Sequence, residues 1–207
     1  MRTDCATRPN TLFIACGAIA KEVAYLAQVN EWYNVQITCL PASWHNTPKK
    51  IAPAIKSKIQ KFRKIYDKIY VLYGDCGTGG ELDEVLEKEE IERISGPHCY
   101  EFFMGRDEFL ETHCAEPGCF YLTDYLARHF DRLVIKGLGL DKYPILLEDY
   151  FKHYKKLIYI AQTNDLNLQK KAEKAANYLG LSYEYRFRGY GDLGAFLESK
   201  IKSGLEN

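Results

Sequence analysis

Three cysteines lie at or just beyond the ends of predicted strands, where thiols can bind a metal or act as nucleophiles. Cys16 closes the apolar run that begins at Thr11, Cys39 lies near the end of a second run, and Cys76 follows a third. In an open parallel sheet the carboxyl ends of the strands meet at one edge, where ligands bind. Thiolates are soft ligands that suit zinc and iron–sulfur clusters. We therefore expect a metal site at this edge, held by Cys16, Cys76 and Cys99.

Cys99 comes after the break at Gly96–Pro97 and is expected to lie near the other thiols. If this segment is extended, alternate side chains share a face, so Glu101 would lie beside Cys99 and carry protons. His45, in the loop after the second strand, is the expected base or an alternative ligand. Simpler roles stay open for all three. Cysteine is common in cores, Glu101 would otherwise be a surface carboxylate, and His45 a loop residue that caps a helix.

A glycine-rich turn over residues 74–80 follows the third strand. Its backbone amides, at the start of the next helix, could face an anion. We expect cofactor-binding roles at the turn and at the glycine after Cys16, namely for Gly17, Gly74, Asp75, Gly77, Thr78 and Gly79. The turn has neither a GxGxxG fingerprint nor a Walker lysine, so its glycine content alone would indicate a nucleotide.

Two pairs in the middle of the chain allow either a site or a purely structural role. Cys114 and Cys119 flank a turn, and they would form either a second small metal site or an exposed pair of loop thiols. Asp124 and Arg128 are four residues apart on an expected helix. At this spacing they would form either a local ion pair or a substrate anchor.

The elements that must position these residues alternate between strand and helix. Strands are predicted at 11–16, 35–40, 68–73, 157–161 and 182–187, and helices at 18–28, 51–65, 81–93, 166–179 and 193–201. This alternation predicts an α/β fold with a three-layer Rossmann-like or flavodoxin-like parallel sheet. Residues 97–155 are less regular, with helices expected at 106–112 and 121–130. We interpret them as a helical insertion or lid in a single domain of residues 1–207.

Composition excludes several classes of protein. The 28 basic side chains balance 28 acidic ones, which argues against a nucleic-acid partner. No apolar run reaches the length that spans a bilayer, and the polar start lacks a signal peptide, so neither a membrane partner nor export is expected. The odd count of seven cysteines indicates reduced thiols in the cytoplasm.

Several segments together resemble a prokaryotic family known as domain of unknown function 1638, over about residues 12–193. The segments are Ala15-Cys16-Gly17-Ala18, Trp44-His45-Asn46, the stretch YGDCGTGG at 73–80, the stretch GPHCYE at 96–101, Leu122-Thr123-Asp124 and residues 157–162. The two stretches given in letters are the specific part. Genes of this family often lie beside corrinoid methyltransferase genes. The resemblance therefore implies methyl-group or corrinoid metabolism by association.

The leading expectation is an enzyme with a cysteine-ligated zinc or [4Fe-4S] centre that acts on a small molecule in anaerobic one-carbon, methyl-transfer or sulfur metabolism. An open position on the metal would activate the substrate. One alternative is a non-catalytic accessory protein that binds a corrinoid or a corrinoid methyltransferase partner, although the chain lacks the DxHxxG pattern of known base-off domains. Another is a metal-free enzyme with Cys76 as nucleophile. The sequence does not predict the oligomeric state.

Overall fold

The computed structural model describes residues 10–202 and has a mixed α/β fold with parallel sheets flanked by helices. The Rossmann-like or flavodoxin-like fold class expected from the sequence is confirmed. The chain forms two compact units, which we describe separately. Unit 1 comprises the residues up to Cys99 and those from Gly194 onward, and unit 2 comprises Tyr100–Leu193. Within residues 10–202, no helix combines the length and the apolar character needed to cross a membrane.

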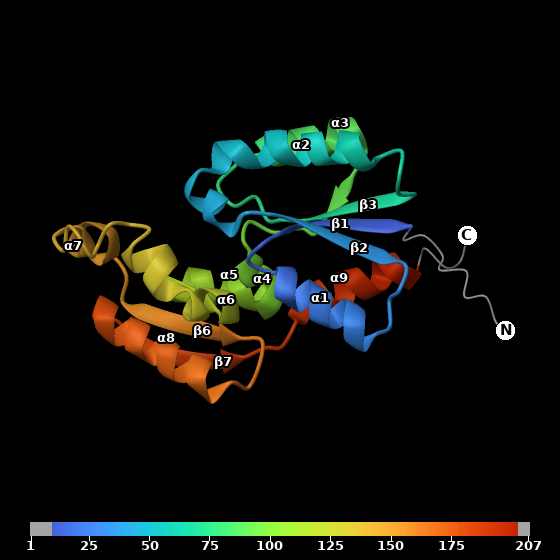
Figure 1. The fold of residues 1–207 in the computed structure, drawn as a ribbon. Coiled ribbons are helices and arrows are strands. Elements are labelled where there is room, and N and C mark those ends of the chain that lie inside the picture. The colour runs from blue at the N-terminus through green and yellow to red at the C-terminus, as the bar shows by residue number, and fades with distance from the viewer. Residues whose placement is uncertain (1–9, 203–207) are drawn as a thin grey trace. The chain divides into compact units, whose positions relative to one another are not determined.

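Unit 1 contains a four-stranded parallel sheet in the order β2-β1-β3-β4. Its strands are β1 (Thr11–Cys16), β2 (Val35–Leu40), β3 (Lys68–Leu72) and β4 (Glu92–Arg93). Its helices are α1 (Ala20–Val29), α2 (Ile51–Phe62), α3 (Glu81–Glu89) and most of α9 (Gly191–Lys202), with short 3-10 turns η1 (Ala42–Asn46) and η2 (Pro48–Lys50). Figure 1 shows α2 and α3 over one face of this sheet and α1 and α9 over the other.

The sequence pattern explains why this sheet is covered on both faces. Phe13 and Ile14 are adjacent in β1, so they point to opposite faces, and both are 0% exposed. Such continuous apolar strands are typical of parallel sheets. On α2, Ile51, Ile55 and Ile59 recur every four residues and are fully buried, so one stripe of that helix packs on the sheet. The carboxyl ends of β1 and β3 thus lie at one edge of a rigid core.

Unit 2 contains a three-stranded parallel sheet in the order β5-β6-β7. The strands are β5 (Cys119–Thr123), β6 (Lys156–Ala161) and β7 (Ser182–Phe187). Its helices are α5 (Arg106–Ala115), α6 (Asp124–Arg128), α7 (Leu146–Phe151), α8 (Leu166–Leu179), a π-helical turn η3 (Asp131–Ile135) and α4 (Cys99–Met104), whose first residue belongs to unit 1. Alternate residues of β6 pack in one apolar cluster with α6, η3 and α8, while Phe109 of α5 contacts Tyr121.

The middle of the chain differs from the sequence prediction at β5. Residues 121–130 were expected to form one helix, but Cys119–Thr123 is a strand and only Asp124–Arg128 is helical, so that prediction was wrong. Tyr121, Leu122 and Thr123 are consecutive and all buried. A short continuous apolar run has no period that distinguishes a strand from a buried helix. The stretch expected to be helical therefore supplies a strand to a second sheet.

Candidate functional site

The three predicted thiols lie near one another in unit 1. Cys16 is the last residue of β1, Cys76 lies in the turn after β3, and Cys99 begins α4. Burial, followed by the charge of Cys16, raises the pKa of Cys76 to about 12. Burial raises the pKa of Cys99 well above its usual value, and the charges of Cys76 and Cys16 raise it further. The convergence expected at the edge of the sheet is therefore present.

These thiols are neighbours, but they do not form a preformed metal site. Within residues 10–202, no group of three or more His, Cys, Asp or Glu side chains is placed so that it could hold a metal ion. All three sulfurs are free, and burial raises each pKa, so the thiols are protonated near neutral pH. Cys39 is exposed on β2 and is not one of the three predicted ligands, but burial and the charge of Cys16 raise its pKa, so it lies near this cluster.

Cys76 has a backbone conformation that the sequence did not reveal. Its φ of 49° lies in the left-handed region, which costs a non-glycine residue about 1–2 kcal/mol. Two hydrogen bonds hold the turn to the segment before α4. The amide of Asp75 donates to the Gly96 carbonyl at 3.1 Å, and that of Cys76 donates to the Pro97 carbonyl at 2.8 Å. Strained conformations of this kind cluster at functional sites, where the surrounding structure enforces them.

The glycine-rich turn already encloses an anion, which is the carboxylate of Asp75. This carboxylate accepts hydrogen bonds from the amides of Gly77 and Gly79 at 3.2 Å, from that of Gly80 at 2.9 Å, and from the Thr78 hydroxyl at 2.6 Å. Burial opposes ionisation of Asp75, but the four hydrogen bonds outweigh it and hold its pKa below the usual value. An external anion at these amides would have to displace Asp75.

Two of the other glycines expected to bind a cofactor have structural roles. A Cβ at position 74 would lie 2.9 Å from the Pro97 carbonyl oxygen, so only glycine allows the two segments to approach this closely. A Cβ at Gly17 would lie 3.0 Å from the Leu40 carbonyl oxygen, to which the Gly17 amide donates a hydrogen bond. Both glycines therefore tie the strand ends of unit 1 to their neighbours.

Tyr73 is a member of the site that sequence reasoning missed. It follows β3 directly, is only 2% exposed, and its hydroxyl lies beside the thiol of Cys16. Burial and then the charge of Cys16 raise the pKa of Tyr73 far above its usual value. A hydrogen bond to the Cys16 sulfur raises the pKa of Tyr73 and lowers that of Cys16, although its geometry is not that of a regular hydrogen bond. A buried hydroxyl that is held so loosely is costly and calls for an explanation.

Arg93 and Glu22 were also missed. The Arg93 guanidinium binds both carboxylate oxygens of Asp83, at 2.5 and 2.9 Å, and donates to the carbonyls of Ile94 and Gly96 at 2.8 and 3.2 Å. It therefore fixes the segment on which the Cys76 turn rests. Glu22 lies on α1, is only 6% exposed, and its charge raises the pKa of Cys99. Its place three residues after Ile19, on the apolar stripe of α1, was the available signal.

Of the two predicted proton carriers, His45 lies in the expected segment after β2, and Glu101 does not lie as expected. His45 is exposed on η1, where its ring centroid lies 6.2 Å from that of His98. Glu101 is buried, but it lies on α4 and not on an extended segment, so the prediction that it shares a face with Cys99 was wrong. Glu101 also belongs to unit 2, whereas the thiols belong to unit 1.

Asp124 forms a buried hub in unit 2 and does not pair with Arg128. It is 2% exposed and accepts hydrogen bonds from the Tyr159 hydroxyl at 2.7 Å, the Gln162 amide at 3.0 Å, and the amide and hydroxyl of Thr163 at 3.0 and 2.5 Å. The Asp124 amide in turn donates to the Gln162 side chain at 2.8 Å. The hub therefore joins the ends of β5 and β6.

The raised pKa of Cys76 predicts a loss of stability in alkaline solution. The usual value of this pKa is 9.0, and the folded value is about 12. Below pH 9 the thiol is protonated in both states, so its contribution is complete. Between pH 9 and 12 only the unfolded chain loses the proton, so the free energy of unfolding falls by up to about 1.4 kcal/mol per pH unit.

Urea unfolding at pH 8, 9, 10 and 11 would measure this slope. Cys76→Ala, which has no proton to lose, is expected to show a shallower decrease than the wild type. Cys114→Ala, which removes an exposed thiol of unit 2, serves as the control. Equal slopes in the wild type and Cys76→Ala would contradict the assignment.

One family model matches the chain. It is described as "Protein of unknown function (DUF1638)", and it covers residues 39–197. The match includes Cys76 and Cys99, whereas β1 and Cys16 lie before it. No curated protein matches the chain.

Proposed function

We propose a function from the thiol cluster itself, because the chain belongs to the DUF1638 family, whose description states no activity. The family model matches most of the length of the chain. We propose that Cys16, Cys76 and Cys99 take up a soft metal ion, as zinc or within an iron–sulfur cluster, and that the protein is an enzyme acting on a small molecule. The observation that carries this proposal is the convergence of three thiols from separate segments, in which the charge of Cys16 acts on Cys76 and the charges of Cys76 and Cys16 act on Cys99.

The electrostatics of the cluster favour a cationic occupant. Burial raises the pKa of each thiol, the charge of Cys16 raises that of Cys76 further, and the charges of Cys76 and Cys16 raise that of Cys99 further, so the metal-free thiols hold their protons. A bound cation reverses this balance, because coordinating thiols lose their protons. The donor type therefore fits a soft metal. The placement of the side chains is not that of a preformed site, since no such ligand group is present within residues 10–202.

The chain's own residues have distinct roles in this proposal. Cys76 presents its sulfur from a turn that Arg93 and Asp75 hold in place. The Tyr73 hydroxyl lies beside the Cys16 thiol and lowers its pKa, so it can donate a hydrogen bond to a sulfur at the centre. Glu22 is the proposed proton carrier in place of Glu101, because it belongs to the same unit as the thiols. A bound zinc ion would supply Lewis acidity.

Zinc titration of the reduced, metal-free protein tests the proposal. We expect one zinc ion per chain, with release of protons to a pH indicator because protonated thiols become ligands. Cys76→Ser should weaken zinc affinity at least tenfold. Cys114→Ser should leave it unchanged, because Cys114 is exposed and belongs to unit 2, whereas the thiol cluster belongs to unit 1.

The proposal fails if the wild type takes up no zinc, or if Cys76→Ser binds zinc as the wild type does. Circular dichroism of each variant separates loss of the fold from loss of the site, and Cys99→Ser provides a second variant from another segment. An iron–sulfur centre would differ from zinc by visible absorption in protein purified without oxygen.

The alternatives have less support. A metal-free enzyme with Cys76 as nucleophile needs a thiolate near neutral pH, whereas the pKa of Cys76 is raised to about 12. The corrinoid-binding or methyltransferase-partner alternative rests on the family resemblance alone. We keep a cytoplasmic location in the proposal, because free thiols of this kind require a reducing compartment.

A further inference from the structure

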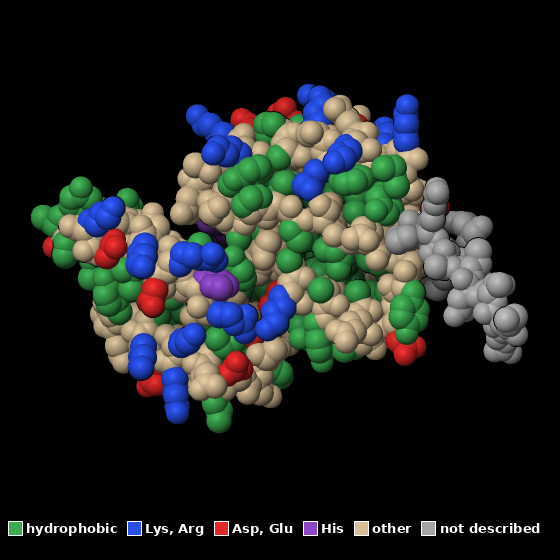
Figure 2. Space-filling model, in the orientation of Figure 1, with side chains coloured by type: hydrophobic (Ala, Val, Ile, Leu, Met, Phe, Trp, Pro, Cys, Tyr) green, Lys and Arg blue, Asp and Glu red, His purple; other side chains and the backbone are tan. Residues whose placement is uncertain are grey.

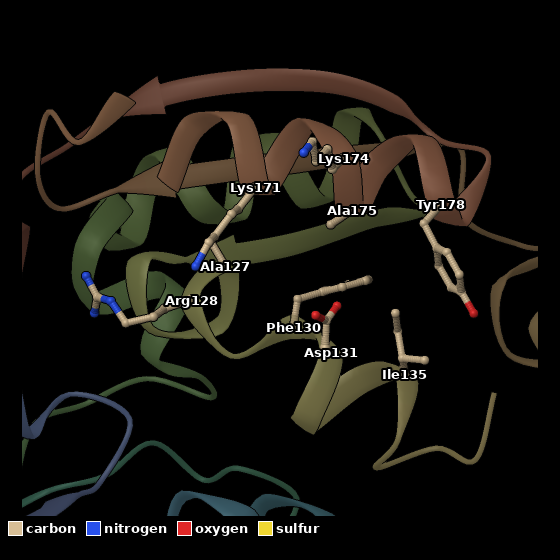
Figure 3. A pocket seen from close by; sticks show the side chains of 9 residues that line it. All are labelled: Ala127, Arg128, Phe130, Asp131, Ile135, Lys171, Lys174, Ala175 and Tyr178. Atoms are coloured by element: carbon tan, nitrogen blue, oxygen red, sulfur yellow. The ribbon is translucent and has the colours of Figure 1, made fainter. Parts of the chain in front are cut away.

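Unit 2 has a groove of about 280 Å³ that the thiol centre does not use. The groove lies between α8, α6 and the π-helical turn η3. Figure 3 shows the side chains that line it, which are Ala127, Arg128, Phe130, Asp131, Ile135, Lys171, Lys174, Ala175 and Tyr178. Ala127, Phe130 and Ala175 are buried members of the apolar cluster of unit 2 and form its floor. Apolar pockets with a few polar groups are the usual form of small-molecule sites.

The charges around the groove are uneven. Three of its lining residues are basic, Arg128, Lys171 and Lys174, against the single acid Asp131. Within residues 10–202, none of these three basic side chains forms an ion pair within 4.0 Å. Figure 2 shows Lys and Arg side chains around a histidine over α6. Burial lowers the pKa of His129, and Arg132, Arg128 and Lys171 lower it further, which agrees with a positive field here.

The basic, acidic and aromatic side chains of the groove follow one another along its length. Lys171, Lys174, Ala175 and Tyr178 stand at i, i+3, i+4 and i+7 of α8, so they line one stripe of that helix. In Figure 3, Arg128 and Lys171 lie towards one end, Tyr178 lies at the other, and Asp131 lies between them. Seven residues of helix separate Lys171 from Tyr178 by about 10 Å. This is a rise between Cα atoms, and the long side chains of Lys171 and Tyr178 can converge from these positions on one molecule that joins a phosphate to a planar ring.

Aromatic surface is available at the end away from Arg128 and Lys171. The rings of Phe130 and Tyr178 lie edge to face, with centroids 6.3 Å apart, and Tyr178 is 43% exposed. A planar ring of a ligand can stack on such a side chain. The Asp131 carboxylate, between the two ends, can accept hydrogen bonds from sugar hydroxyls or an exocyclic amine. The adjacent π-helical turn is also a type of irregularity frequent at functional sites.

From this order of groups we infer that the groove of unit 2 binds a small molecule of nucleoside monophosphate size, with its phosphate at Arg128 and Lys171 and its planar ring at Tyr178. Lys174 adds positive charge along the same stripe of α8. The glycine-rich turn of unit 1 has no part in this site, since its amides already bind Asp75.

Calorimetric titration with AMP, GMP, CMP and UMP, beside inorganic phosphate and adenosine, tests the inference. We expect at least one nucleotide to bind at least tenfold more tightly than phosphate or adenosine alone. Only a nucleotide carries both the phosphate for the basic end of the groove and the planar ring for the aromatic end. The double variant Lys171→Gln, Lys174→Gln should weaken that nucleotide at least tenfold, and Tyr178→Ala should weaken it without changing the affinity for phosphate.

Lys170→Gln is the matched control, because Lys170 is an exposed lysine of the same helix that does not line the groove. It should bind the nucleotide as the wild type does. The altered side chains are exposed, so the variants should keep the wild-type unfolding curve. No binding by any of the four nucleotides, or an equal loss in Lys170→Gln and in the double variant, would overturn the inference.

Discussion

Asp124→Ala is expected to lower the free energy of unfolding by about 4 kcal/mol, the largest effect that we predict for one side chain. The substitution removes a buried carboxylate that accepts four hydrogen bonds at the ends of β5 and β6. The Tyr159 hydroxyl and the amides of Gln162 and Thr163 would lose this partner inside the protein. Each buried donor left without a partner costs about 1–3 kcal/mol.

Urea unfolding followed by circular dichroism measures this effect. Asp131→Ala is the control, because Asp131 is an exposed acid of the same unit, and its loss should change stability by less than about 0.5 kcal/mol. The hub lies in unit 2, so the fraction of Asp124→Ala that stays folded should still bind zinc at unit 1. A decrease below about 1 kcal/mol would show that the hub contributes little to stability.

Gly74→Ala is expected to cost about 3 kcal/mol and to disturb the thiol cluster as well. The added Cβ would lie 2.9 Å from the Pro97 carbonyl oxygen and 3.0 Å from the His98 amide nitrogen. Both are backbone atoms that cannot rotate away. Because Pro97 accepts the hydrogen bond from the Cys76 amide, the same displacement moves the sulfur of Cys76. Zinc affinity should therefore fall together with stability.

Gly79→Ala separates this steric effect from backbone strain. A Cβ at Gly79 meets no atom within 4 Å, but its φ of 64° is unfavourable for alanine. Its cost should be about 1 kcal/mol, and its zinc affinity should match that of the wild type. If Gly74→Ala and Gly79→Ala had the same free energy of unfolding, the backbone atoms around Gly74 would move aside at little cost.

The regular elements could be predicted because their hydrophobic periods are long and clear. The strands at 11–16, 35–40 and 182–187 and the helix at 166–179 have the predicted bounds. Period alone could not identify β5, whose residues are buried without alternation. It also could not assign the strands to two sheets, because strand pairing depends on contacts between distant segments that a local pattern does not contain.

The candidate site followed from the rule about strand ends for Cys16 and Cys76, and their convergence in unit 1 agrees with it. The rule says nothing of backbone hydrogen bonds, so it could not show that Asp75 fills its own turn. It could not find Tyr73 or Glu22 either, because a polar residue in an apolar pattern appears as an irregularity until its neighbours are known. Arg93, among charged residues, was indistinguishable from a surface side chain.

Because Cys76 has a left-handed backbone conformation, selection for stability and selection for a thiol favour different residues at this position. Glycine would accept the same φ without strain, so selection for thermal stability alone would favour glycine there. Any cysteine in that turn is kept at a cost to the fold. A library of variants sorted only for folding would therefore drift from cysteine to glycine at position 76, whereas one sorted for the chemistry of the protein would retain the thiol.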